Sequence, residues 1–128
     1  MNITDGFDQA IEMFEQNCPD NGGEERAVRI ARRLLHLIHC AQTNKNLEDY
    51  VKALVDAGNE NEKERTEKQK KIIENARNKL FGSKYKTEGP NLRHLQLQIH
   101  PDKCGAQEGK YNPQKLCVQA FTLANALY

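Results

Sequence analysis

The sequence predicts an all-α fold. Several segments repeat apolar residues at intervals of three and four, which is the spacing of one face of an α-helix. No stretch of useful length alternates apolar and polar residues in the way a half-buried strand does. Short stretches with proline and glycine, such as CPDNGG at residues 18–23, separate the periodic segments and mark helix ends.

The N-terminal part, residues 1–58, is predicted to hold three helices that act as a specificity or interaction region. The segment 4–17 begins at Thr4 or Asp5, residue types that favour the N-cap position. The segment 24–43 has acidic residues in its first turn, where the helix dipole favours negative charge. It also has the broadest apolar stripe, so we expect it to form the central core helix. The apolar positions of these two segments are Phe7, Ile11, Phe14, Val28, Ile30, Ala31, Leu34, Leu35, Ile38 and Ala41.

A third helix is predicted over residues 46–59, and a charged segment follows it. Gly58 lies where a C-terminal glycine cap belongs. Residues 59–69 have no apolar stripe at their start, so they form either a solvated extension of the next helix or a flexible linker. The apolar residues that complete this next helix are Ile72, Ile73, Ala76 and Leu80.

A short helix is predicted over residues 90–99, within a C-terminal region that spans 70–128. Pro90 suits its first turn. The helix stops at His100, because a residue that precedes a proline is pushed out of the helical region. After a loop, a closing helix follows at 113–127. The core between these two helices is predicted to consist of Leu92, Leu95, Ile99, Leu116, Ala120 and Phe121.

Composition predicts an intracellular protein. No stretch approaches the roughly 20 apolar residues that a membrane span needs. The N-terminus lacks the basic start and apolar block of a secretory signal. The four cysteines form no Cys-x-x-Cys pair, so we expect free thiols in a reducing compartment. These observations favour a cytoplasmic or nuclear location.

Charge is unevenly distributed, although the net charge is only +1. Residues 1–62 carry twelve acidic and six basic side chains, whereas residues 63–128 carry thirteen basic and six acidic ones. The segment 63–86 alone has nine basic side chains against three glutamates, which leaves open a patch for nucleic acid or an anionic membrane. Aromatic residues for base stacking are nearly absent there. The favoured interpretation is a solvated helix with i,i+4 ion pairs, here Glu64–Lys68 and Glu67–Lys71.

The tetrapeptide His100-Pro101-Asp102-Lys103 joins the two C-terminal helices. Proline fixes φ and stiffens the tip, which lowers the entropy lost when a partner docks. Asp102 offers a carboxylate that pairs well with an arginine of a partner. His100 lies at the end of its helix, where the dipole favours a cation or donor. The tetrapeptide is therefore suited to docking on another protein.

Set between two helices of matching phase, this tip resembles that of the J domain, the DnaJ-like module that activates heat-shock ATPase chaperones of the seventy-kilodalton class. Leu95, Leu97 and Ile99 stand where J domains place core leucines and an aromatic residue. The pair Ala120-Phe121 is similar to the small-plus-aromatic pair of their third helix. The resemblance implies an antiparallel helical hairpin that carries the His-Pro-Asp loop at its tip.

The resemblance covers about residues 70–128. The turn NKLFG, which ends at Gly82, is similar to the Leu-Gly turn after the first helix of J domains. The long loop, the extra upstream helices and the C-terminal position are most similar to the auxilin type. Only seventeen residues separate Gly82 from His100, fewer than is usual, and the short helix carries Arg93 but no lysine. The electrostatic part of the expected chaperone contact is therefore thin.

The resemblance implies a co-chaperone that docks on and stimulates a heat-shock ATPase, recruits a client through residues 1–58, and is not itself an enzyme. One alternative is a degenerate J-like interaction or assembly module without chaperone activation. A second alternative is a basic, nucleic-acid-associated helical protein. The residues implied in chaperone binding are His100, Pro101, Asp102, Lys103 and Arg93, with Lys84, Lys86 and Lys110 as additional basic contacts.

Two other groups of residues could carry chemistry. A zinc site would draw on the histidines and cysteines of the C-terminal region, but their spacing fits none of the tight ligand pairs of structural zinc sites. His36 and Cys40 share a helix face at i,i+4, and a buried cysteine beside a partly exposed histidine is the expected outcome. We therefore expect no metal, cofactor or catalytic residue. The zinc candidates are His94, His100, Cys104 and Cys117.

Overall fold

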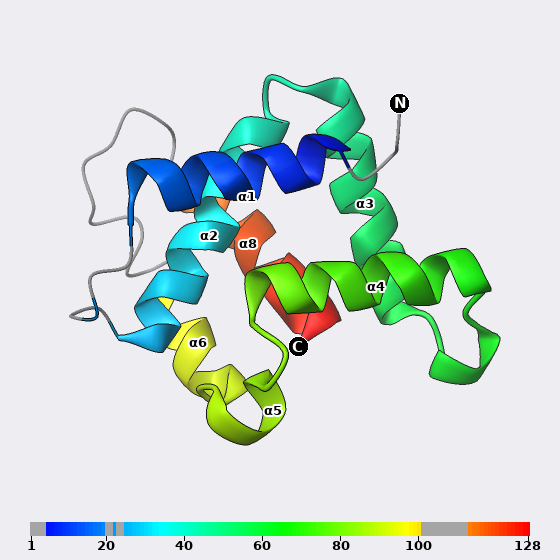
Figure 1. Cartoon of the computed structure of the whole chain (residues 1–128). Coiled ribbons are helices and arrows are strands. Elements are labelled where there is room, and N and C mark those ends of the chain that lie inside the picture. The colour runs from blue at the N-terminus through cyan, green and yellow to red at the C-terminus, as the bar shows by residue number, and fades with distance from the viewer. Residues whose placement is uncertain (1–4, 20–21, 23–24, 101–112) are drawn as a thin grey trace.

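The computed structural model describes residues 5–19, 22, 25–100 and 113–128, and every regular element in these ranges is helical. The prediction of an all-α fold is confirmed for this part of the chain. The elements are α1 (Asp5–Asn17), α2 (Arg26–Ala41), α3 (Lys45–Asn59), a 3₁₀ turn (Glu62–Glu64), α4 (Glu67–Leu80), α5 (Tyr85–Glu88), α6 (Leu92–Gln98) and α8 (Pro113–Leu127) (Figure 1).

The helix α2 contacts α1, α3, α4, α6 and α8, as predicted for the central core helix. Packed against it is α8, which is also largely buried. It contacts α2, α3, α4 and α6, while α1 and α4 cross the near side of the molecule in Figure 1. The N-terminal helices α1–α3 and the C-terminal helices thus share one buried cluster rather than forming separate cores. Its largest fully buried side chains include Phe7, Leu34, Tyr50, Leu54, Ile73, Leu80, Leu95, Ile99, Leu116, Leu123 and Leu127.

Side-chain caps set where α3, α4 and α6 begin. Asn44 accepts a hydrogen bond from the Leu47 backbone N–H at the start of α3. Asn91 accepts one from the His94 N–H at 2.7 Å, so α6 begins at Leu92. Such caps satisfy N–H groups that have no partner within the helix. The prediction that Pro90 lies in the first turn of α6 is therefore wrong, because the cap follows it.

The segment before α4 does not continue that helix. Thr66 caps α4 in a reciprocal capping box with Gln69, and this arrangement fixes the backbone of Thr66 in an extended conformation. The single long helix offered as one interpretation of residues 59–69 is therefore wrong. Only the 3₁₀ turn at Glu62–Glu64 interrupts the irregular connection.

Gly58 lies inside α3 instead of capping its end, so the predicted glycine cap is wrong. The positive-φ glycines among the described residues are Gly22 and Gly82. A side chain at Gly58 would collide with the backbone carbonyl of Ala126 in α8. A glycine is needed there because α3 and α8 approach each other closely.

Four arginines satisfy backbone carbonyls at the C-terminal ends of helices, which have no partner within their own helix. Arg77 donates to the Leu127 carbonyl of α8 at 2.7 Å, and Arg33 donates to the Leu80 carbonyl of α4 at 3.2 Å. Each cation also lies at the negative end of a helix dipole. Two further cases are Arg65, which donates to Ala57 and Gly58 of α3, and Arg26, which donates to Glu88 of α5.

Glu15 joins α1 to α2 through two arginines. Its carboxylate accepts from Arg29 at 2.5 Å and from Arg33 at 2.7 Å, and Arg29 also lies over the Phe14 ring. Burial by itself would raise the pKa of Glu15, but the hydrogen bonds from the two arginines outweigh it, so its pKa lies below the ordinary 4.5. Arg29 is 5% exposed, and the pair with Glu15 compensates for burying this charge.

We predict that Gly58→Ala destabilises the fold by about 1–3 kcal/mol, the usual range for overpacking. The matched control is Gly6→Ala in α1, where an added Cβ would meet only Asn44 Nδ2, at 4.0 Å. Because alanine favours helices, the control should be neutral or stabilise by up to about 1 kcal/mol. Urea denaturation followed by circular dichroism measures both. Equal effects at the two positions would contradict the close approach of α3 to α8.

We predict that the Glu15 pair stabilises the protein at neutral pH and that this contribution is lost in acid. A lowered folded-state pKa means that the stabilisation is present above the ordinary value of 4.5 and disappears as the pH falls through the folded value. Glu15→Gln should cost about 1 kcal/mol or less at pH 7, because Glu15 is partly exposed. The difference from the wild type should shrink below pH 4.5.

The measurement is the free energy of unfolding between pH 3 and 8. Glu12→Gln, on an exposed position of the same helix, is the control and should follow the wild-type curve. A Glu15→Gln difference that stays constant across the acid range would show that the carboxylate charge contributes nothing.

Candidate functional site

The candidate site is the end of α6, where the chain leaves the helix at His100. The Ile99 N–H donates to the Gln96 carbonyl, and the Ile99 side chain is fully buried. His100 itself is exposed, and its ring lies perpendicular to the ring of Phe121 of α8, with 6.2 Å between the ring centroids. The buried isoleucine thus anchors the helix end while the histidine next to it stays accessible.

The helices α6 and α8 run antiparallel beside this site. Gln96 donates to the Asn125 side chain at 3.3 Å. Four residues later in the chain, just beyond α6, His100 meets Phe121, which lies four residues before Asn125 in α8. In both contacts the two residue numbers add to the same total, as expected for segments that run antiparallel. The predicted core positions Leu95, Ile99, Leu116 and Ala120 are buried, whereas Leu92 and Phe121 are partly buried.

Several predicted site residues lie outside the described residues, namely Pro101, Asp102, Lys103, Cys104 and Lys110. Of the other predicted chaperone contacts, Arg93 is exposed on α6. Lys84 is exposed and pairs with Glu88 at 3.7 Å. Lys86 is exposed, with its ammonium 5.9 Å from the Tyr85 ring centroid. Leu97, placed among the core positions by the resemblance, is 43% exposed instead.

The start of α6 is tied to the start of α2, a contact that sequence reasoning missed. His94 Nε2 contacts the Glu25 carboxylate, and Glu25 is the N-cap residue of α2 but makes no side-chain cap bond there. The two residues are 69 positions apart in the chain, so no local pattern could indicate the contact. It engages His94, which leaves Arg93 as the basic residue of α6 that faces solvent.

The pair His36 and Cys40 is close but not activated. His36 Nε2 lies 3.5 Å from Cys40 Sγ. Burial lowers the pKa of the His36 imidazole, in spite of a hydrogen bond with the backbone of Ala10, and burial also raises the pKa of the Cys40 thiol. Both shifts favour the neutral forms, whereas a nucleophilic cysteine needs the thiolate. Both residues are half-buried, so Cys40 is less buried than predicted.

The remaining cysteines correct one expectation. Cys18 and Cys40 are free, but Cys117 is disulfide-bonded. The prediction that all four thiols are free is therefore wrong. Within the described ranges no group of three or more His, Cys, Asp or Glu side chains is placed to hold a metal ion.

No known family, curated protein or solved structure matches this chain. None of the helices in the described ranges is long and apolar enough to cross a membrane. The residues of the chain and their arrangement are therefore the basis for a proposal about function.

We predict that Cys40 reacts slowly with iodoacetamide at pH 7.5, roughly fivefold or more slowly than a free cysteine, because burial disfavours its thiolate. His36→Ala should not slow the reaction further, since His36 does not act as its base. Alkylation rates resolved by peptide mass spectrometry test this. A fast Cys40 that loses its reactivity in His36→Ala would instead show an activated pair.

Proposed function

We propose that this protein is a J-domain-like co-chaperone that docks on a heat-shock ATPase of the seventy-kilodalton class and stimulates it through His100-Pro101-Asp102. The observation that carries the proposal is the position of His100. It is exposed at the end of α6, its ring contacts α8, and the sequence Pro-Asp-Lys follows it directly.

Support comes first from the way His100 is held. Leu95 and Ile99 are fully buried, and α6 and α8 meet along an antiparallel contact. A seven-residue helix such as α6 is too short to be stable alone. Packing against α2 and α8 therefore holds it in place, and a fixed docking element loses less entropy on binding than a mobile one.

Basic groups near α6 add electrostatic support. Arg26, at the start of α2, donates to the Glu88 carbonyl at the end of α5, while the neighbouring Glu25 contacts His94 of α6. The end of α5 and the start of α6 therefore lie together. Arg93, which is exposed on α6, would meet an acidic surface of a chaperone, where complementary charge raises the rate of association.

The experiment is single-turnover ATP hydrolysis by a heat-shock ATPase, with and without this protein. We predict stimulation by the wild type and a loss of at least about tenfold in that stimulation with His100→Gln, as expected when a residue at the centre of a contact is lost. His94→Gln is the matched control, because it makes the same change six residues earlier, at a side chain engaged with Glu25. It should keep stimulation within about twofold of the wild type.

Absence of stimulation by the wild type would contradict chaperone activation. Equal losses in both histidine variants would contradict a specific role for His100. In either case the alternative is a J-like interaction or assembly module. The short α6, with a single exposed arginine and a histidine engaged by α2, is the observation that favours this alternative.

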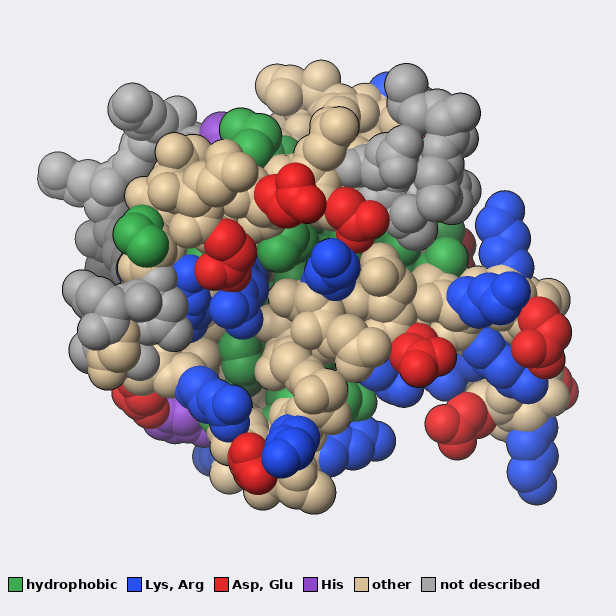
Figure 2. All heavy atoms as spheres, in the orientation of Figure 1, with side chains coloured by type: hydrophobic (Ala, Val, Ile, Leu, Met, Phe, Trp, Pro, Cys, Tyr) green, Lys and Arg blue, Asp and Glu red, His purple; other side chains and the backbone are tan. Residues whose placement is uncertain are grey.

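A nucleic-acid-associated role has less support. Figure 2 shows acidic side chains among the basic ones over α4 and the 3₁₀ turn, and Lys70 pairs with Glu67 at 3.3 Å. The aromatic residues of this segment, Phe81 and Tyr85, are buried, so they offer no stacking platform for bases. The charge distribution is that of a solvated helix. The ion pair between Glu67 and Lys70 has i,i+3 spacing, whereas the predicted pairs have i,i+4 spacing.

A further inference from the structure

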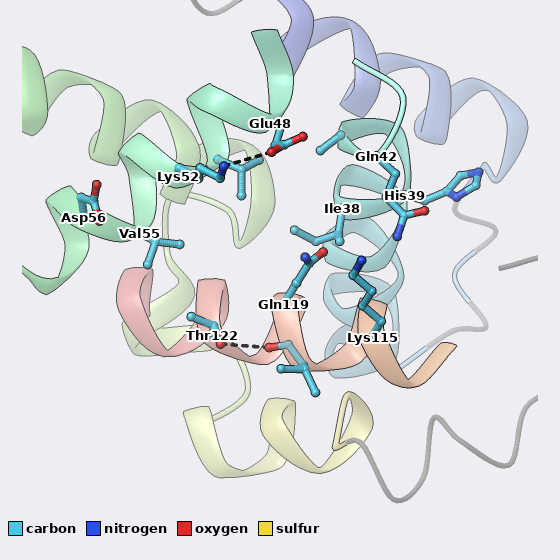
Figure 3. A pocket seen from close by; sticks show the side chains of 13 residues that line it. Ile38, His39, Gln42, Glu48, Lys52, Val55, Asp56, Lys115, Gln119 and Thr122 are labelled. Atoms are coloured by element: carbon cyan, nitrogen blue, oxygen red, sulfur yellow. Dashed lines mark hydrogen bonds and ion pairs between the residues drawn. The ribbon is translucent and has the colours of Figure 1, made fainter. Parts of the chain in front are cut away.

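A groove of about 870 Å³ runs along α8, between α2 and α3 (Figure 3). Along α8 it extends from Lys115 to Thr122 and along α3 from Glu48 to Asp56. At 1.5 Å per residue these stretches are about 10–12 Å long, or roughly two helical turns. No local sequence pattern indicates the groove, because its walls come from three helices that are separated in the chain.

The base of the groove and part of its walls are apolar, while polar residues such as Gln42, Gln119 and Thr122 line the rest. Ile38 and Ala41 of α2 are buried at its base, at 2% and 6% exposure. Val51 and Val55 of α3 line it and are partly buried. Val118 of α8 is 49% exposed, one of few large apolar side chains so open to solvent among the described residues. An apolar hollow that opens to water in this way is typical of a binding site.

The rim of the groove carries an ordered set of charges. Lys52 pairs with Glu48 at 3.0 Å, so these two charges compensate each other. Asp56 makes no ion pair with any described residue. In Figure 3, Asp56 and Lys115 lie at opposite ends of the groove. At one end of the groove, Asp56 therefore offers a carboxylate to whatever occupies it.

We propose that this groove binds one amphipathic helix of a partner protein. Its apolar side chains at i, i+3 or i+4, and i+7 would cover Ile38, Val55 and Val118, in the helix-in-groove mode. A lysine or arginine near its N-terminus would pair with Asp56. This orientation also places the positive end of the dipole of the partner helix beside Asp56.

A helix fits these observations better than an extended strand or a small molecule. All walls in Figure 3 are helices, whose backbone groups are already paired, so they offer no edge for strand addition. A small ligand needs most of its surface enclosed, whereas the exposure of Val118 shows a groove open along its side. Two turns of a partner helix match the length and the opening.

Helix binding in the groove does not depend on the chaperone contact. In the co-chaperone proposed above, it would provide the site that recruits a client or adaptor. The groove and the tip share α8, because Phe121 meets His100 while Val118 and Thr122 line the groove. A partner held there would lie next to the chaperone.

The test is a selection on the full chain from a displayed library of randomised 14-residue peptides held helical by a lactam bridge. We expect enriched peptides with an apolar i, i+3 or i+4, i+7 pattern and a basic residue near the N-terminus. Val118→Asp should weaken their binding by about tenfold or more, and Asp56→Asn by up to about fivefold. Met13→Asp is the control, because Met13 is 51% exposed but lies outside the groove.

Absence of enriched peptides would overturn the proposal, as would peptides that bind Val118→Asp as tightly as the wild type. Enrichment of peptides without a basic residue, indifferent to Asp56→Asn, would overturn the assigned charge pairing. The selection contains no ATPase, so its outcome is separate from that of the hydrolysis experiment. Thermal melts of the three variants show that the binding changes do not come from unfolding.

Discussion

The burial of α8 between the N-terminal helices and α6 is the constraint on which the rest of the structure depends. Leu116, Leu123 and Leu127 are at most 1% exposed, and their burial contributes about 1.5–3 kcal/mol each. Gly58 lets α3 approach the end of the same helix. The position of His100 and the walls of the groove both follow from where α8 lies.

Arginines supply the second constraint. Arg26, Arg33, Arg65 and Arg77 each donate to a carbonyl near the end of a helix, so a positive side chain takes the place of water or a glycine cap. Because the guanidinium group has several donors in a fixed geometry, Arg33 can bind Glu15 and the Leu80 carbonyl together. Several arginines of this chain thus bind its own backbone, which leaves fewer arginines for an external partner.

Local patterns in the sequence were sufficient to predict the longer helices and much of the core between α6 and α8, because apolar periodicity reports burial directly. They did not predict the short helix α5. They failed where the role of a residue depends on a contact with a distant part of the chain. Gly58 resembled a helix cap, but its role depends on Ala126 of α8. The contact of His94 with Glu25 and the groove beside α8 likewise join segments that no local spacing relates. His100 could be identified because its neighbours in the chain carry the signal.

The arginine contacts also bear on the order in which the molecule is assembled. Arg26 and its acceptor are 62 residues apart, and Arg33 and its acceptor are 47 apart. In each pair the donor precedes the acceptor. During synthesis from the N-terminus, α2 is therefore made before the carbonyl groups to which its arginines donate. Domains generally fold as units, and α1–α3 share one buried cluster with α8, so these arginine contacts form only when the later helices have joined that cluster.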